Sequence, residues 1–194
     1  MAILIPGKAL RWPSLLYIFA HFIHLTVAGQ AVILPVDTEG KVEYHESVIS
    51  DHSDYCTLWK NAIGFLSTLS VPDQLNREAR INEEMSELNQ QTGFYLFTKP
   101  GLTKQIDGVM VVDITLKIEE GKYNYRIHNF RFIKYARDRF GKFSPESSKK
   151  YALELYYPDS KKRSWKTHFE EINSKILELE QKMNAKLTSY RNFK

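Results

Sequence analysis

Five side chains of this sequence could perform acid–base or nucleophilic chemistry: His45, His52, Cys56, Asp113 and His128. Histidine changes charge near neutral pH, and a thiol or carboxylate beside it can act as a nucleophile or hold its ring in place. Their spacing matches neither HExxH nor GxSxG, and the chain has no phosphate-binding glycine loop. A hydrolytic enzyme is therefore the alternative hypothesis. We predict a protein that is not an enzyme, without catalytic residues, cofactor or metal.

Cys56 is the only cysteine of the chain, which excludes an internal disulfide and a cysteine-based zinc site. It stands early in a predicted amphipathic helix, where a lone cysteine is usually a small buried hydrophobic residue. We expect Cys56 to pack in the core. A nucleophile beside His45 or His52 is the alternative.

Asp113 and His128 lie in the stretch that organises the chain, residues 109–135, which predicts a long β-hairpin. Apolar and polar residues alternate on both sides of Glu120-Gly121, and glycine supplies the positive φ of a two-residue turn. Counting outward from this turn pairs Asp113 with His128. The other predicted pairs are Ile118 with Tyr123, Leu116 with Tyr125 and Ile114 with Ile127 on the core face, and Thr115 with Arg126 and Val111 with Phe130 on the opposite face.

The hairpin face opposite the core is where we expect a partner to bind. This face is polar near the turn and carries aromatic side chains farther from it. Asp113 could raise the pKa of His128, as carboxylates do at functional sites; the alternative is an exposed cross-strand pair without a special role. The predicted partner-binding residues are Asp113, Thr115, Arg126, His128, Phe130 and Phe132.

Two helices and further strands must hold this hairpin. Alternation predicts a first strand at residues 41–49, and a period of 3.6 then predicts a helix over 51–70 with Ser53 as its N-cap. Apolar residues at every third or fourth position predict a C-terminal helix at about 165–188. The chain before that helix is irregular, and we expect residues 151–157 to pack on the sheet edge or on the last helix.

Residues 77–91 are ambiguous. Their composition favours a helix, but residues such as Ile81 and Met85 could also alternate along one face of a strand. Residues 89–93 then offer turn formers before a clear strand at 94–98. We predict a strand for 77–91, on the strength of the resemblance described below.

The first thirty residues resemble a secretory signal peptide. Lys8 and Arg11 form a positive region, an apolar run covers 14–27, and small residues offer a cleavage site near Gln30 or Ala31. We predict a leader cleaved from residues 1–30, a single domain over 31–194, and export to the periplasm or beyond; an uncleaved N-terminal anchor is the alternative. Cleavage would remove two of the four net positive charges, so the excess is too weak to indicate nucleic acid or an anionic membrane as the partner.

The predicted order of elements is β-α-β-β-β-β-α, which is typical of an α+β two-layer sandwich. The pattern GKY-x-Y-R-I-x-N-F-R-F of residues 121–132, with Leu58-Trp59 and Phe65-Leu66 in the first helix, resembles the exported Bacteroidota family known as domain of unknown function 4468. The resemblance covers about residues 36–190. It implies a TBP-like fold, with a strand at 77–91 and two helices on the convex side of a curved antiparallel sheet. It does not imply DNA binding, because a shared fold is not a shared function.

These observations predict a non-enzymatic binding or structural module of the cell envelope that uses the exposed sheet face. Its partner would be an envelope protein, a peptide or a glycan. Nucleic-acid binding by analogy of fold is the hypothesis that the weak positive charge supports least. Contact with a membrane would come only through an uncleaved leader, and the oligomeric state is left open.

Overall fold

The long hairpin forms the centre of the sheet in the computed structural model. The structure describes residues 32–50, 53–72, 80–98, 105–159 and 163–189, and residues 32–194 make one compact unit. β4 (Ile106–Glu119) and β5 (Lys122–Arg137) meet at Glu120-Gly121, where Gly121 has a φ of 66°. The predicted hairpin and its turn are confirmed.

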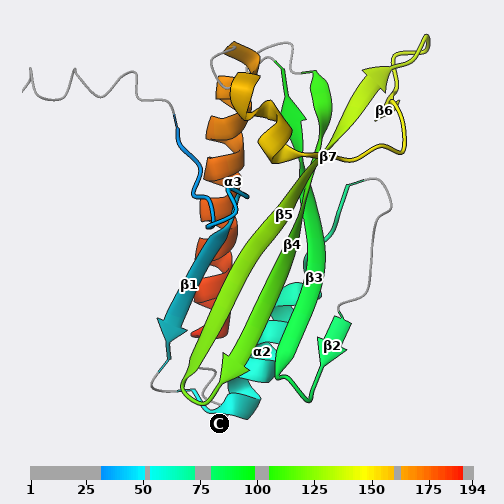
Figure 1. Ribbon diagram of the computed structural model, residues 1–194. Helices are drawn as coiled ribbons and strands as arrows, with labels where there is room; N and C mark the ends of the chain where they lie inside the picture. The colour runs from blue at the N-terminus through cyan, green and yellow to red at the C-terminus, as the bar shows by residue number, and fades with distance from the viewer. Residues whose placement is uncertain (1–31, 51–52, 73–79, 99–104, 160–162, 190–194) are drawn as a thin grey trace, which may run out of the picture. The chain divides into compact units, whose positions relative to one another are not determined.

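Five strands lie side by side in the order β1-β5-β4-β3-β2, and the short strands β6 and β7 also pair with β5. All of these pairs are antiparallel. Figure 1 shows both helices on the same side of the sheet. The predicted α+β order is confirmed, with β6 and β7 added. The remaining elements are β1 (Tyr44–Ile49), α2 (Tyr55–Leu66), β2 (Arg80–Asn82), β3 (Glu87–Phe97), β6 (Phe143–Pro145), β7 (Tyr151–Ala152), the 3-10 helix η1 (Leu153–Asp159) and α3 (Arg163–Leu187).

The register of the hairpin agrees with the prediction from the turn as far as the pair of Asp113 and His128. Beyond that pair β5 contains one extra residue, and Asn129 has a positive φ of 56° at this β-bulge. Val111 therefore pairs with Arg131, and the predicted pair of Val111 with Phe130 is wrong. Because the bulge shifts the alternation of β5 by one residue, the side chains after it change faces.

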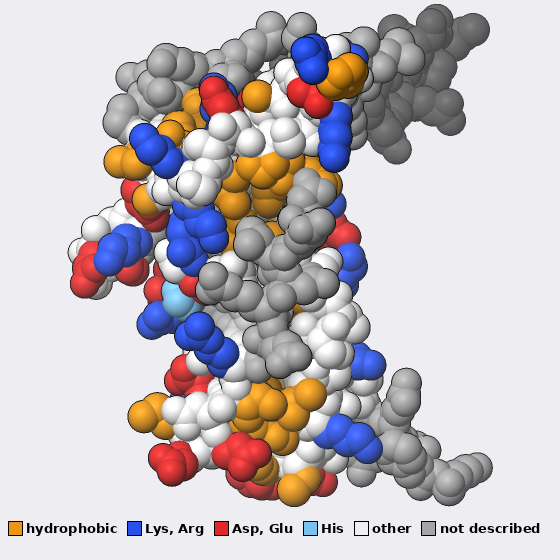
Figure 2. Space-filling model, turned by 90° about the vertical axis from the view of Figure 1, so that its right-hand side faces the viewer, with side chains coloured by type: hydrophobic (Ala, Val, Ile, Leu, Met, Phe, Trp, Pro, Cys, Tyr) orange, Lys and Arg blue, Asp and Glu red, His pale blue; other side chains and the backbone are white. Residues whose placement is uncertain are grey.

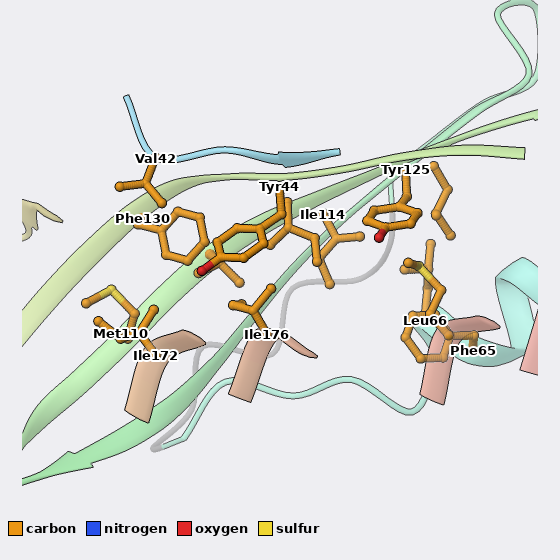
Figure 3. Close-up of a cluster of buried hydrophobic side chains, with 14 of the residues drawn as sticks. Val42, Tyr44, Phe65, Leu66, Met110, Ile114, Tyr125, Phe130, Ile172 and Ile176 are labelled. Atoms are coloured by element: carbon orange, nitrogen blue, oxygen red, sulfur yellow. The ribbon is translucent and has the colours of Figure 1, made fainter. Parts of the chain in front are cut away.

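The main core fills the space between the sheet and the helices (Figure 3). Phe130 is 1% exposed, and its ring centre lies 5.9 Å from that of Tyr44. Phe132 is 3% exposed and packs edge-on against Trp165 of α3, with ring centres 5.4 Å apart. The prediction that Phe130 and Phe132 lie on the exposed partner-binding face is therefore wrong, because the bulge turns both rings toward the helices.

α3 packs its apolar stripe against the sheet and confirms the predicted C-terminal helix. Tyr156 of η1 stacks on Trp165, with ring centres 3.8 Å apart, and β7 pairs with β5, so the described side chains of residues 151–156 contact both the helix and the sheet. Tyrosine hydroxyl groups from the sheet add polar contacts to this packing. Tyr44 donates to Asn173 at 2.9 Å, and Tyr123 donates to Asn184 at 2.7 Å. The buried residues of the stripe are Trp165, Phe169, Ile172, Ile176, Met183 and Leu187.

α2 is shorter than the sequence predicts. Asp54 rather than Ser53 is its N-cap, and the Asp54 carboxylate accepts a hydrogen bond from the Thr57 amide at 2.7 Å. Cys56 is exposed, so the prediction that it packs in the core is wrong. It lies in the first turn, before Leu58 opens the buried stripe of the helix.

Residues 80–97 form two antiparallel strands, β2 and β3. The predicted strand is confirmed at residues 80–82 and 87–91 but is interrupted by a turn at residues 83–86, and residues 89–93 form no turn. Ser86, in the turn, has a positive φ of 53°. β3 runs unbroken through the predicted turn because each of those residues pairs with β4.

A smaller apolar cluster lies on the sheet face opposite the helices, at the end far from the hairpin turn. It contains Val71, Val109, Val111, Ile133 and Tyr135. The chain reaches this face along the outer edge of β3, where the Ser70 carbonyl accepts a hydrogen bond from the Gly93 amide at 3.2 Å. Described residues of the chain thus cover the apolar end of this face, and none of them covers the end near the turn.

The predicted leader over 1–30, His52 and residues 77–79 lie outside the described ranges. Within those ranges, no helix is long and apolar enough to span a bilayer.

Candidate functional site

The uncovered end of the sheet carries a continuous set of polar side chains, which we call the polar face. Strand alternation directs these side chains away from the helices. Figure 2 shows a histidine among acidic and basic side chains at the margin of the molecule. The polar face consists of Glu43 and His45 at β1, Asn89 and Gln91 on β3, Asp113 and Thr115 on β4, and Arg126, His128, Asn129 and Arg131 on β5.

Asp113 is the centre of this network. Its carboxylate accepts hydrogen bonds from the Gln91 amide at 2.7 Å, from the Asn129 amide, and from the Arg131 guanidinium at 3.2 and 3.3 Å. The bulge supplies two of these donors, because it places both Asn129 and Arg131 on the side of Asp113. A carboxylate with three donor side chains is held in one orientation.

Two buried polar atoms beside Asp113 have no hydrogen-bond partner within the described part of the chain. They are Oε1 of Gln91, an acceptor, and Nε of Arg131, a donor. Buried polar atoms are nearly always paired, and leaving one unpaired costs about 1–3 kcal/mol. Beside Asp113 the polar face therefore holds one buried acceptor and one buried donor that the described residues leave unpaired.

Thr115 connects β3 to β5 across β4. Its hydroxyl group donates to Oδ1 of Asn89 at 2.6 Å and lies 3.1 Å from Nε2 of His128. Because the single hydroxyl hydrogen is used by Asn89, the imidazole must donate in the second contact. The uncharged His128 ring thus carries its hydrogen on Nε2.

Burial lowers the pKa of His128 below its ordinary value, and the positive charge of Arg126 lowers it further. The negative charge of Asp113 acts in the opposite direction and is the smaller influence. Asp113 thus acts on the pKa of His128 in the predicted direction, but burial and Arg126 outweigh it, so the net rise that was expected is wrong. The lowered pKa favours the uncharged form of the His128 imidazole.

Two open depressions lie along the polar face. One, of about 260 Å³, lies at Asp113 and His128. The other, of about 440 Å³, lies at Thr115 and Arg126, where an oxygen of Glu43 lies 3.6 Å from Nε of Arg126. Together they form a shallow polar surface that crosses the sheet.

The structure brings together four of the six predicted partner-binding residues: Asp113, Thr115, Arg126 and His128. The two predicted aromatic members are in the core, as described above. Val111, which was also expected on this face, is fully buried in the smaller apolar cluster. The part of this surface that the described residues leave uncovered is therefore polar, without the predicted aromatic side chains.

The residues of the hydrolytic alternative are spread over the molecule. Asp113 and His128 share one depression, His45 lies at the other, and Cys56 is exposed on α2. In the ranges that the structure describes, no group of three His, Cys, Asp or Glu residues is arranged to hold a metal ion.

Besides Glu43 at β1, four residues of the polar face were missed at the level of sequence: Asn89, Gln91, Asn129 and Arg131. Asn89 and Gln91 lie on β3, and no short turn joins β3 to β4 from which their register could be counted. The other two lie at and beyond the bulge, where counting from the hairpin turn fails. An asparagine inside an alternating strand is the one local signal, because asparagine adopts positive φ more readily than most residues.

A buried histidine at the other end of the sheet was also missed. His168 of α3 is 1% exposed, and its Nε2 lies 2.8 Å from Oδ2 of Asp107 on β4. The centre of the Trp165 ring lies 5.1 Å from that of the imidazole. Because the ring is enclosed, we interpret this pair as a structural link between α3 and β4.

Neither a family model nor a curated protein matches the chain. Two solved structures are similar to it. A TBP-like protein from Parabacteroides distasonis is 12% identical, with a TM-score of 0.54 over 77% of this chain and 96% of that one. A DUF4468 family protein from Bacteroides ovatus is 12% identical, with a TM-score of 0.52 over 81% of this chain and 94% of that one. The chain therefore has a TBP-like α+β fold and resembles the DUF4468 family in structure.

Proposed function

We propose that the polar face binds a partner segment rich in hydrogen-bonding groups, a peptide or a glycan, and that the protein is a non-enzymatic binding module of the cell envelope. The observation that carries the proposal is the unpaired Oε1 of Gln91 and Nε of Arg131 beside the immobilised Asp113 carboxylate. These atoms lie on the sheet face that the helices leave uncovered. The envelope location rests on the predicted leader.

The width of the polar face suits an extended segment. The polar face crosses four neighbouring strands, β1, β5, β4 and β3, and three spacings of about 4.8 Å between strands give about 14 Å. About four residues of extended peptide, at about 3.3 Å each, cover this width.

The charges on the face support a partner of mixed polarity. Lys117 and Arg126 are more than half exposed, and Glu43 and Glu87 line the same depression. A polyanion such as nucleic acid would meet these carboxylates as well as the cations, and phosphate contacts dominate nucleic-acid affinity.

Charge reversal on the polar face tests the proposal. The tagged full chain and the double variant Lys117→Glu with Arg126→Glu would each be used to capture partners from the envelope fraction of the source organism. We expect the unaltered chain to retain a defined protein or glycan and the double variant to lose at least nine-tenths of it, because both side chains are exposed and line the depression.

The matched control is Lys60→Glu with Lys166→Glu, which makes the same change of charge on the helices α2 and α3, away from the polar face. It should capture the partner as well as the unaltered chain does. Equal capture by the polar-face variant and this control would refute the assignment, and absence of the protein from the envelope fraction would refute the proposed location.

A further inference from the structure

The helix layer leaves part of its side of the sheet uncovered. α2 has 12 residues and is about 18 Å long, whereas β3 has 11 residues and is about 36 Å long. Figure 1 shows α2 behind only the half of β3 near β2. Phe94 lies on β3 farther along, where it is only partly buried although it faces the helix side.

A groove of about 420 Å³ occupies this place between the end of α2, β3 and α3. Its apolar lining comes from all three elements: Phe65 and Leu69 at the end of α2, Phe94 on β3 and Leu179 on α3. Leu69, Phe94 and Leu179 are partly buried hydrophobic residues that pack on the main core. The groove is thus an apolar surface that the chain leaves accessible on its helix side.

One wall of the groove is positively charged. Lys175, Lys182 and Lys186 of α3 line it together with one carboxylate, Glu178. Glu178 binds Lys175 at 3.0 Å and Lys182 at 2.7 Å, and these two cations lower its pKa to about 2. The wall therefore keeps an excess of two positive charges at neutral pH.

Lys186 is the cation best placed to receive an anion. In the described part of the chain it has no ion-pair partner, unlike the two lysines that hold Glu178. Its Cε lies 3.9 Å from the position that a Cβ on Gly64 would take, so its side chain reaches across to α2. Lys186 therefore lines the groove at its boundary with α2.

The volume of the groove favours a thin ligand over a helix as its occupant. From Lys175 to Lys186 the wall measures about 16 Å, and a helix of this length and about 10 Å in diameter occupies about 1,300 Å³. An alkyl chain of the same length, with a width of about 4–5 Å set by carbon contact distances, occupies about 250 Å³. The alkyl chain can lie entirely within the groove of about 420 Å³, whereas a helix would lie largely outside it.

We propose that this groove binds a single-chain amphiphile with an anionic head group. The alkyl chain lies on Phe65, Leu69, Phe94 and Leu179, and the head group binds Lys186. A fatty acid and an alkyl phosphate or sulfate share this chemistry. The site is separate from the polar face and does not depend on its function.

Calorimetric titration of the full chain with dodecanoate, below its micelle concentration, tests the proposal. A twelve-carbon chain with bonds of about 1.5 Å extends to about 14 Å and fits the wall. We expect one dodecanoate per chain and binding at least fivefold weaker for dodecanol, which lacks the charge, and for dodecyltrimethylammonium, which reverses it.

Two variants locate the site. Lys186→Glu should weaken dodecanoate binding at least fivefold and leave dodecanol unchanged, whereas Leu69→Gln should weaken both ligands. Lys166→Glu makes the same change of charge on the same helix outside the groove and should have no effect. Circular dichroism would verify that each variant is folded.

Three results would overturn the proposal. Equal affinity for all three amphiphiles would mean that the lysines do not select the head group. Binding that persists unchanged in both groove variants would place the ligand elsewhere. Absence of dodecanoate binding would also contradict the proposal. If an acidic amphipathic peptide bound the groove in that case, the partner would be a protein instead.

Discussion

The hydroxyl group of Tyr125 lies between two carboxyl groups on the helix side of the sheet. It is 3.0 Å from an oxygen of Glu46 on β1 and 2.9 Å from an oxygen of Glu180 on α3. A phenol has one hydrogen to donate, so it cannot satisfy both carboxylates at once. Burial raises the pKa of Glu180, and the negative charge of Glu46 raises it further, although the bond from Tyr125 opposes this.

The raised pKa of Glu180 predicts the direction of a pH effect on stability. A carboxyl group that is more basic in the folded state than in the unfolded state stabilises the fold below its unfolded pKa and loses this contribution as pH rises through its folded pKa. We therefore expect the free energy of unfolding of Glu180→Gln, minus that of the unaltered chain, to be more positive at pH 7 than at pH 4. Because Glu180 is partly exposed, the change should stay below about 1 kcal/mol, measured by urea denaturation at both pH values.

Glu178, on the same helix, provides a control for which the pH effect on stability should have the opposite direction. Its pKa is lowered to about 2 by Lys182 and Lys175, so its contribution is present above the unfolded pKa and is lost as pH falls. Glu178→Gln should lose more stability at pH 7 than at pH 4. If both variants responded to pH in the same direction, the interpretation of the Glu180 site would be wrong.

The bulge in β5 is the feature of a single element that most affects the arrangement of the site. It directs Phe130 into the core and Arg131 toward Asp113, so one extra residue determines the composition of both sheet faces. Asn129 can take the left-handed conformation that the bulge requires, whereas a β-branched residue cannot do so without strain.

Substitutions of Asn129 test this role. Asn129→Val and Asn129→Gly both remove the hydrogen bond to Asp113, but only valine opposes the positive φ. We expect Asn129→Val to be less stable than Asn129→Gly by about 1–2 kcal/mol, measured from the midpoints of chemical denaturation. Equal stability of the two variants would show that the backbone conformation of this residue does not determine the bulge.

At the scale of the whole molecule, the sequence predicts the layers better than it predicts the site. Alternation around Gly121 predicts the register up to Asp113 and His128, because this register depends only on counting from one turn. Beyond this pair, one extra residue at Asn129 moves the following side chains of β5 to the opposite sheet face. A periodic pattern of apolar residues does not show where a single residue is inserted. The pairing of Gln91 with Asp113 joins strands from different turns, so local pattern could not place Gln91 at the site.

The lone thiol also shows why packing cannot be read from residue type. Cysteine is usually buried, but Cys56 falls in the first turn of α2, before the buried stripe begins, and is exposed. The fold therefore owes no stability to this residue or to a disulfide.

Reducing agent should accordingly leave the unfolding transition of the monomer unchanged. Without reductant the exposed thiol should form a covalent dimer, visible on a non-reducing gel, because an unpaired surface cysteine is free to join another chain. Cys56→Ser should abolish the dimer and keep the same melting temperature within about 1 °C. A lower melting temperature for this variant would mean that the thiol contributes to packing after all.

The place of β1 at the edge of the sheet has a consequence for the order in which the protein can assemble. Tyr44 pairs with Ile127, which is synthesised 83 positions later, and β5 then also receives β7 from farther along the chain. Contacts between distant residues form slowly because a long loop must close first. During synthesis β1 therefore stays unpaired until the central hairpin has been synthesised. In that interval the nascent chain exposes an unpaired strand edge, and it is then that we expect it to be most prone to aggregation and most dependent on chaperones.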